Sequence, residues 1–427
     1  MMVDKLSKRS LAVLLMLYVC PAFAQGGSDT LHLRLVDAEK VFLEKNLLLL
    51  AERYSIDAAE AQVMQARLYN NPTLALSGNL YNPQRSKFGD ISERTGQYTA
   101  NVQQLILLAG KRNKQIRLAE TEVALSRHRF FDLMRTLRFT LRSSFYTVYF
   151  LQDSYNAYAT QIASLTKLDA AYSALQDKGV ISRRDGLRIR SLLYTLRGEQ
   201  AVLLNEIHEA TQDLQILLQT GAYIVPELDR ATPKRYSIRE SNAVALIDTA
   251  YNNRYDLKAA EASVVYAQQH YALQRAMAVP DLTLGVEFDK RGSFVDNATF
   301  LNVAFDLPFF NRNQGNIKAA RYTAAQNQLV AGQKKLVVET EVWNAYRQAI
   351  NTETALTQVD AGFRAAFRGL LESLEDNFRK HNVSLLEFTD FNESYKDTML
   401  QLNQLENEYL QSVERLNYAV GRPVFDE

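Results

Sequence analysis

One junction occurs twice in this chain, and it restricts the possible architecture more than any other feature. In the first copy, residues 67–72 (RLYNNP) lead into the alternating segment 73–80; in the second, residues 275–280 (RAMAVP) lead into 281–288. Proline ends a helix because it lacks an N–H donor and disfavours the helical conformation of the residue before it. The repetition therefore predicts an internal duplication in which each repeat joins a long helix to a strand.

The first 24 residues have the pattern of a signal peptide. A basic start is followed by the apolar run Leu11–Cys20 and by Ala22-Phe23-Ala24, which fits a cleavage site and predicts a mature chain from Gln25. The apolar run is too short to span a bilayer of about 30 Å. A lipoprotein signal ending at Cys20 is the alternative, for which Val19 is a poor preceding residue. Because Cys20 is the only cysteine, the sequence predicts no disulfide and no thiolate metal site in the mature chain.

The charge balance and hydropathy exclude several classes of protein. The chain has 49 basic and 48 acidic residues and a formal net charge of +1, so nothing attracts it to nucleic acid. After the signal, no apolar run is long enough to form a transmembrane helix. If this protein lies in a membrane, it must therefore use strands.

Two long stretches without proline predict long helices. Between Gly110 and Gly179 lie 68 residues with neither proline nor glycine, which as one helix would extend about 100 Å. Apolar residues recur there at helical spacing, which favours coiled-coil packing. A second proline-free stretch runs from Phe309 to Arg422, where we expect Gly362 and Gly369 to weaken the helix without breaking it.

Two further helices are expected before the proline junctions, at about 36–70 and 242–278. Asn46 and Arg254 occupy equivalent places in them, each 26 positions before its proline. The prolines between the halves predict a linker between the repeats at 226–241. The first repeat then covers 25–225 and the second 242–427.

Four segments alternate between apolar and polar residues, at about 72–81, 97–107, 280–289 and 299–308. Each has the ~9–10 residues that a tilted strand needs to cross a bilayer, and apolar-out, polar-in alternation is typical of an outer-membrane barrel. A half-buried sheet in a soluble domain is the alternative. Four strands cannot close around a lumen, and lipid tolerates no open edge, so the barrel must be shared. Two chains would give eight strands and three would give twelve, arranged with cyclic symmetry.

At this point the chain resembles the TolC family of outer-membrane efflux channels. The motifs that carry the resemblance are residues 71–74 (NPTL), 105–112 (LILLAGKR), 280–282 (PDL) and 306–317 (DLPFFNRNQGNI), and the last is similar to the CzcC-like heavy-metal efflux branch. The resemblance implies a mainly α fold with a β-barrel portion. In this architecture, three chains form a 12-stranded outer-membrane β-barrel continuous with a long periplasmic α-helical barrel. The resemblance also implies an equatorial belt around the helical barrel, to which residues 226–241 and the C-terminal segment near Pro423 would contribute.

The resemblance also implies two sites at the periplasmic end. Two turns 202 positions apart would be hairpin tips where an adaptor docks, and their residues are Gly179, Ile181, Ser182, Asp185, His381, Val383 and Ser384. Here His381 replaces the usual glycine of the second tip. Ser182 and Ser384 are also good N-caps with an acidic residue three positions on, the spacing of a capping box.

Glu387 and Asp390 stand where the family places acidic residues at the tunnel mouth. Three residues apart, they share one helical face, and a threefold axis would make rings of six carboxylates that attract cations and hold a gate. The alternative interpretation is a solvated, capped helix start.

No catalytic arrangement is found, so the sequence predicts neither an enzyme nor a cofactor. The five histidines form no metal-binding motif, and no P-loop is present. Gly110-Lys111-Arg112 is better explained as a bend between strand and helix than as a phosphate site.

These features predict a passive exit duct in the cell outer membrane with a large periplasmic portion. Its expected partners are two further copies of itself, outer-membrane lipid, a periplasmic adaptor (membrane fusion protein) and an inner-membrane pump of the RND type. The sequence alone does not name the cargo, and heavy-metal cations are one candidate. The alternative is a periplasmic coiled-coil adaptor or structural protein without a membrane barrel.

Overall fold

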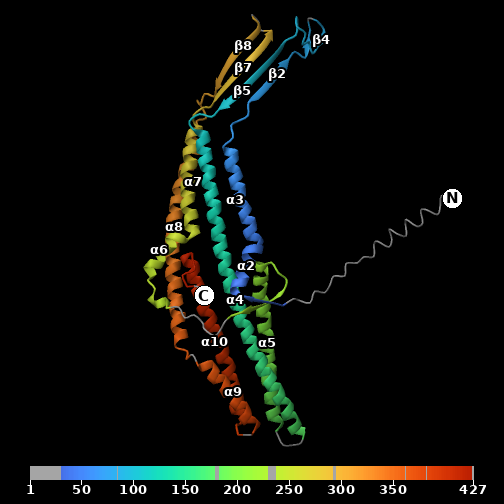
Figure 1. Ribbon diagram of the computed structural model, residues 1–427, viewed down its shortest axis with the longest axis vertical. Helices are drawn as coiled ribbons and strands as arrows, with labels where there is room; N and C mark the ends of the chain where they lie inside the picture. Colours follow the sequence, from blue (N-terminus) through green and yellow to red (C-terminus); the bar gives the residue numbers. More distant parts are fainter. Residues whose placement is uncertain are drawn as a thin grey trace, which may run out of the picture.

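In the computed structural model the chain is an elongated rod with a small sheet at one end and long helices running away from it (Figure 1). The structure describes residues 30–83, 85–177, 182–228, 237–291, 295–360, 362–380 and 382–425. The expected signal peptide, with Cys20, lies outside these residues. Among the described helices, none has an apolar stretch suited to crossing a membrane.

The sheet contains the four expected strands, which are β2 Thr73–Gly78, β5 Tyr98–Ile106, β7 Leu282–Arg291 and β8 Asp296–Phe305. Their order is β2-β5-β7-β8 and all pairs are antiparallel, so β5 and β7 join the hairpins of the two repeats. β2 is shorter than expected, and β8 begins three residues earlier. The loop after β2 adds a short pair, β3 Tyr81–Asn82 with β4 Lys87–Phe88.

The pairing register gathers most of the apolar residues of the four strands on one face. Leu74 pairs with Val102, Val102 with Val286, and Val286 with Leu301. This face is open: Leu74 is 61% and Leu301 74% exposed. Within the described residues, β2 and β8 each pair along one edge only. The sheet thus has an uncovered apolar face and two free edges.

The first repeat has the long helix that the sequence predicts. α4 runs unbroken over Lys111–Asp177, 67 residues, and α5 Arg183–Leu218 returns beside it. The bend before α4 is made by Ala109 and Gly110, whose φ angles are 54° and 66°. The interpretation of Gly110-Lys111-Arg112 as a bend is confirmed.

The second repeat differs because its proline-free stretch is broken. It forms α8 Gln314–Thr357, α9 Phe363–Arg379 and α10 Leu385–Val420. The expectation that Gly362 would not break the helix was wrong. The Asp360 carboxylate accepts a hydrogen bond from the Gly362 N–H at 3.1 Å, which competes with the helical pattern at this site. Gly369, by contrast, lies within α9.

Each of the two helices before the proline junctions is also split in two. The first forms α2 Leu35–Lys45 and α3 Leu47–Ala66; the second forms α6 Ala243–Asn253 and α7 Tyr255–Met277. The breaks fall at Asn46 and Arg254, the equivalent positions of the two repeats.

The side chains at these breaks make equivalent contacts. The Asn46 amide donates to the Leu217 carbonyl at 3.1 Å, and the Arg254 guanidinium donates to the Ala419 carbonyl at 3.2 Å. Both acceptors lie in the last turn of the final helix of their repeat, where carbonyl groups lack helical partners. The duplication therefore extends to the buried polar contacts.

The equatorial region contains two strands that the sequence analysis did not predict. β1 Thr30–Arg34 pairs in parallel with β6 Tyr223–Glu227, so the start of the expected linker belongs to a small sheet. The short helix η2 Ile238–Glu240 follows. The C-terminus folds back here because the Asn417 side chain binds the backbone of Val424 and Phe425.

Candidate gate and docking tips

The expected sites lie at the end of the rod opposite the sheet, where α4 turns into α5 and α9 into α10 (Figure 1). Of the residues assigned to the tips, Gly179, Ile181 and His381 lie outside the described residues. Both returning helices begin as predicted. Ser182 and Ser384 are N-caps that accept hydrogen bonds from the N–H groups of Asp185 and Glu387, each at 3.2 Å.

The second tip forms a complete capping box. The Glu387 carboxylate accepts from the Ser384 N–H at 2.9 Å, which reciprocates the bond from the Glu387 N–H to the Ser384 hydroxyl. The Ser182 hydroxyl at the first tip donates to the Asp185 carboxylate at 2.6 Å, as the Ser384 hydroxyl does to the Glu387 carboxylate at 2.8 Å. The backbone N–H and the hydroxyl of Ser384 hold the pKa of Glu387 below its ordinary value. Glu387 therefore carries its charge at neutral pH.

The structure places Glu387 and Asp390 together on the first turns of α10, and both are exposed. Neither has a basic partner among the described residues. Val383 is half-buried and packs with the apolar residues of the tip. Within the described residues, the second tip therefore presents two carboxylates without a basic partner above an apolar base.

An aromatic stack below the tips was missed by the sequence analysis. Phe378 of α9 stacks on Tyr172 of α4 with ring centroids 5.8 Å apart and on Phe388 of α10 at 4.4 Å. Phe378 and Phe388 are 4% and 2% exposed. The stack joins the hairpins of the two repeats, so the tips share one apolar core.

Polar contacts connect the same helices further from the tips. The Gln161 amide donates to the Asn392 carbonyl at 3.0 Å, and Lys396 forms an ion pair with Glu199 at 3.0 Å. Burial lowers the pKa of Lys396, but Glu199 outweighs this effect and raises it overall. These bonds fix α10 against both α4 and α5.

The polar face of the sheet carries a carboxylate between two amides. Glu287 accepts hydrogen bonds from Asn101 at 3.1 Å and from Asn302 at 2.9 Å, across three adjacent strands. Ser77 and Thr99 bond to each other on the same face at 2.6 Å. This face is therefore mainly polar, although Phe300 and Leu105 also lie on it.

An ion network surrounds the helix break of the second repeat. Arg254, 1% exposed, binds Asp256 at 2.6 Å, and Asp256 also contacts Lys334 at 2.7 Å. Burial raises the pKa of Asp256, but the bonds from Arg254 and Lys334 outweigh it and hold the pKa well below its usual range. Sequence reasoning noted the position of Arg254 but not this network.

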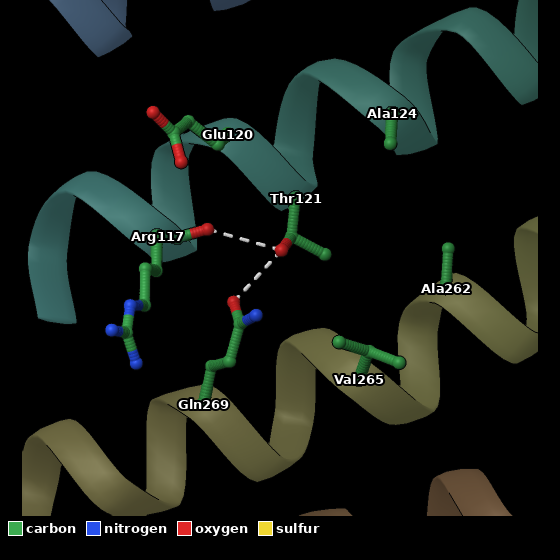
Figure 2. A pocket seen from close by; sticks show the side chains of 7 residues that line it. All are labelled: Arg117, Glu120, Thr121, Ala124, Ala262, Val265 and Gln269. Carbon is green, nitrogen blue, oxygen red and sulfur yellow. Dashed lines mark hydrogen bonds between the residues drawn. The ribbon is translucent and has the colours of Figure 1, made fainter.

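A small cavity of ≈ 330 Å³ lies between α4 and α7 (Figure 2). The Thr121 hydroxyl donates to Gln269 at 2.8 Å across it, and Ala124 and Ala262 leave its other side open. This lining contains no nucleophile beside a base. Within the part of the chain that the structure describes, no group of three or more potential metal-ligating residues is found.

Comparison with known proteins identifies the family of this chain. The family model described as "Outer membrane efflux protein" matches residues 40–219 and 246–422, one segment in each repeat. The chain belongs to this family, and it is an outer-membrane channel of tripartite efflux systems, with a large periplasmic portion. Members of the family work with periplasmic adaptors and inner-membrane pumps.

Particular relatives agree with this assignment. The cobalt-zinc-cadmium resistance protein CzcC of Cupriavidus metallidurans is 26% identical over 337 residues, which cover 76% of each chain. The CmeC outer membrane channel of Campylobacter jejuni has a TM-score of 0.71 at 14% identity, over 92% of this chain and 87% of its own. CusC has a TM-score of 0.70 at 16% identity, over 91% and 92%. The two structures share the fold of this chain.

Proposed function

We propose that three copies of this chain form a passive duct with a 12-stranded barrel, gated at its periplasmic end, through which heavy-metal cations leave. The observation that carries this proposal is the sheet, with its uncovered apolar face, its polar opposite face and its two free edges. Lipid covers such an apolar face, but unpaired edges are not tolerated in lipid. Pairing β8 of one copy with β2 of the next removes both edges, and three copies leave room for a channel.

The gate of this duct consists of Glu387 and Asp390. Both are exposed and have no basic partner among the described residues, and threefold symmetry brings six carboxylates to one mouth. Like charges that are brought close together repel one another unless cations lie between them. The gate therefore concentrates cations and opens when basic groups of a partner engage the carboxylates.

The adaptor docks on the hairpin tips, at the residues of the two turns that include Ser182, Asp185, Val383 and Ser384. The N-caps Ser182 and Ser384 and the aromatic core shared by the two tips give the adaptor a rigid surface to bind. An inner-membrane pump of the RND type supplies the energy, and the chain itself catalyses no reaction. Metal cations are the proposed cargo because the relative covering three quarters of the chain is named for cobalt, zinc and cadmium resistance.

Single-channel recording in planar bilayers tests the gate. Glu387→Ala with Asp390→Ala should raise the conductance and weaken the preference for cations. Glu44→Ala with Asp57→Ala removes the same charges from exposed positions far from the tips and should change neither. Ser384→Ala removes the cap but keeps the charge, so it separates helix capping from gating. Unchanged conductance and selectivity in the double variant would refute the gate.

Fractionation and native mass spectrometry test the duct itself. The protein should sediment with the outer membrane and be extracted by mild detergent as a trimer. A monomer in the soluble periplasmic fraction would instead support the adaptor or structural protein.

A further inference from the structure

Positive charge gathers where the strands meet the helices. The junction segments 67–72, 106–121, 272–281 and 306–321 contain nine basic and three acidic residues, although basic and acidic residues are almost equal in the whole chain. We call these four segments the basic collar. Its segments lie where the helices of the rod meet the sheet (Figure 1).

The acidic residues of the collar leave most of this charge uncompensated. Asp281 is bound to Lys111 at 2.7 Å, and Glu120 to Arg67 at 2.9 Å. Figure 2 shows the side chains of Arg117 and Glu120 pointing apart. Several basic side chains have no acidic partner among the described residues, namely Lys114, Arg117, Arg275, Arg312, Lys318 and Arg321.

Arg275 lies in the last turn of α7, where a positive charge is favourable, but the charges near the starts of α4 and α8 do not stabilise those helices. α4 and α8 both begin in the collar, and neither has an acidic residue in its first turn. Basic residues at a helix N-terminus are unfavourable because that end is already partly positive. An anionic partner outside the chain would compensate these charges.

Exposed aromatic and apolar side chains accompany the charges. Phe310 is 95%, Tyr69 77% and Phe309 73% exposed, and Leu307 continues this surface into the apolar face of the sheet at Phe305. Arg112 lies over the Tyr69 ring at 4.1 Å. Aromatic rings beside basic groups, at the edge of an apolar surface, are typical of the boundary between lipid tails and headgroups.

The depth of the collar also fits that boundary. At ~1.5 Å per residue, Lys114 and Arg117 lie about 5–9 Å from the start of α4, and Lys318 and Arg321 about 6–10 Å from the start of α8. The headgroup layer is roughly 5–8 Å thick on each side of a bilayer. Lysine and arginine side chains are long enough to reach it from these positions.

We infer that the basic collar binds the phosphates of anionic phospholipids in the leaflet of the outer membrane that faces the periplasm. The inference rests on the proposed function, since only a membrane-inserted sheet brings the collar to a headgroup layer. Continuity with the apolar face and the excess of positive charge favour a lipid surface over a protein partner.

Lipid selectivity tests this inference. The full-length protein is placed in nanodiscs of phosphatidylethanolamine and phosphatidylglycerol at 3:1, and the lipids that stay bound are counted by native mass spectrometry. The protein should retain phosphatidylglycerol well above its share of the bilayer, and 0.5 M salt should reduce the excess by screening. Arg312→Gln with Lys318→Gln and Arg321→Gln should lower the ratio of bound phosphatidylglycerol to bound phosphatidylethanolamine about fivefold, the effect of roughly one charge near a membrane surface.

The matched control removes three exposed charges at the other end of the rod, in Arg183→Gln with Arg184→Gln and Arg188→Gln. Its enrichment should equal that of the unaltered protein. If the collar variant fails to insert, the salt dependence of the unaltered protein still decides the question. If the bound lipid has the composition of the bulk bilayer, the inference about the basic collar is refuted while the proposed duct stands. If the protein fails to enter any bilayer, the proposed duct is refuted. The Phe310→Cys variant tests whether this surface is a subunit contact instead. If Cys at this position crosslinks to a second copy and does not react with reagents dissolved in the lipid, the surface is a subunit contact and the inference is refuted.

Discussion

Removing the Arg254 guanidinium should destabilise the helical body more than removing Asn46, its counterpart in the first repeat. In Arg254→Met, the buried Asp256 keeps Lys334 at 2.7 Å and Arg135 at 3.7 Å but loses its bidentate partner. The Ala419 carbonyl and the Glu341 carboxylate lose a donor as well. Breaking a buried ion pair from one side costs about 3–5 kcal/mol.

Asn46→Ala is the matched comparison because it removes neutral groups at the equivalent break. It loses the hydrogen bonds to the Leu49 N–H and the Leu217 carbonyl, both 3.1 Å, which together contribute roughly 1–3 kcal/mol. The assay is the midpoint of thermal loss of the helical circular dichroism signal in detergent. Arg254→Met should lower the midpoint by several degrees and Asn46→Ala by less.

A double-mutant cycle identifies the cause of the larger loss. If the cost of Arg254→Met arises from the Asp256 charge left behind, the same change should cost at least ~1 kcal/mol less in an Asp256→Asn background. Additivity within about 0.5 kcal/mol would refute the electrostatic reasoning. The Arg254 effect would then come from lost packing alone.

Three further predictions concern single positions. The folded-state pKa of Asp256 is depressed, so its stabilising effect is complete above its unfolded pKa of about 3.9 and is lost as the pH falls below that value. The difference between the thermal midpoints of the unaltered protein and Asp256→Asn should therefore stay constant down to about pH 4 and shrink below it, and a difference that is unchanged down to about pH 2 would contradict the assignment. Gly421 has φ +85°, and an added Cβ would lie 3.2 Å from the Arg254 backbone nitrogen, so Gly421→Ala should destabilise the protein by about 1–3 kcal/mol. The control, Gly198→Ala, lies in open space within α5 and should be neutral or slightly stabilising. Equal thermal midpoints of the two variants would show that the turn at Gly421 is not strained. Ser384→Ala should cost about 1 kcal/mol through loss of the cap and speed amide hydrogen exchange in the first turn of α10, and unchanged exchange there would contradict the capping box.

The sequence determined the elements whose causes are local. Proline at 72 and 280 ends a helix wherever the chain is placed, and alternation defines a strand without reference to its neighbours. The unbroken α4 follows from 68 residues without proline or glycine, and the caps at Ser182 and Ser384 follow from side chains that bond within their own turn.

Other features depend on residues far apart in the sequence, and only the tertiary structure decided them. The helices break at Asn46 and Arg254 because buried polar side chains bind carbonyls 171 and 165 positions away. β1 is a strand because β6 pairs with it, and its short sequence contains no signal of that pairing. The stack of Tyr172, Phe378 and Phe388 likewise requires helices of both repeats to be in place.

The same distinction applies to function. Local patterns identified four strands and two capped tips, since strand alternation and capping act over a few residues. The tertiary structure decided that β5 pairs with β7, which aligns the apolar residues of both hairpins on one face and leaves β2 and β8 free. It also decided which charges are compensated, because an ion pair such as Lys111 with Asp281 joins residues 170 positions apart. Long-range contacts of this kind depend on the packing of whole helices, which no local pattern specifies.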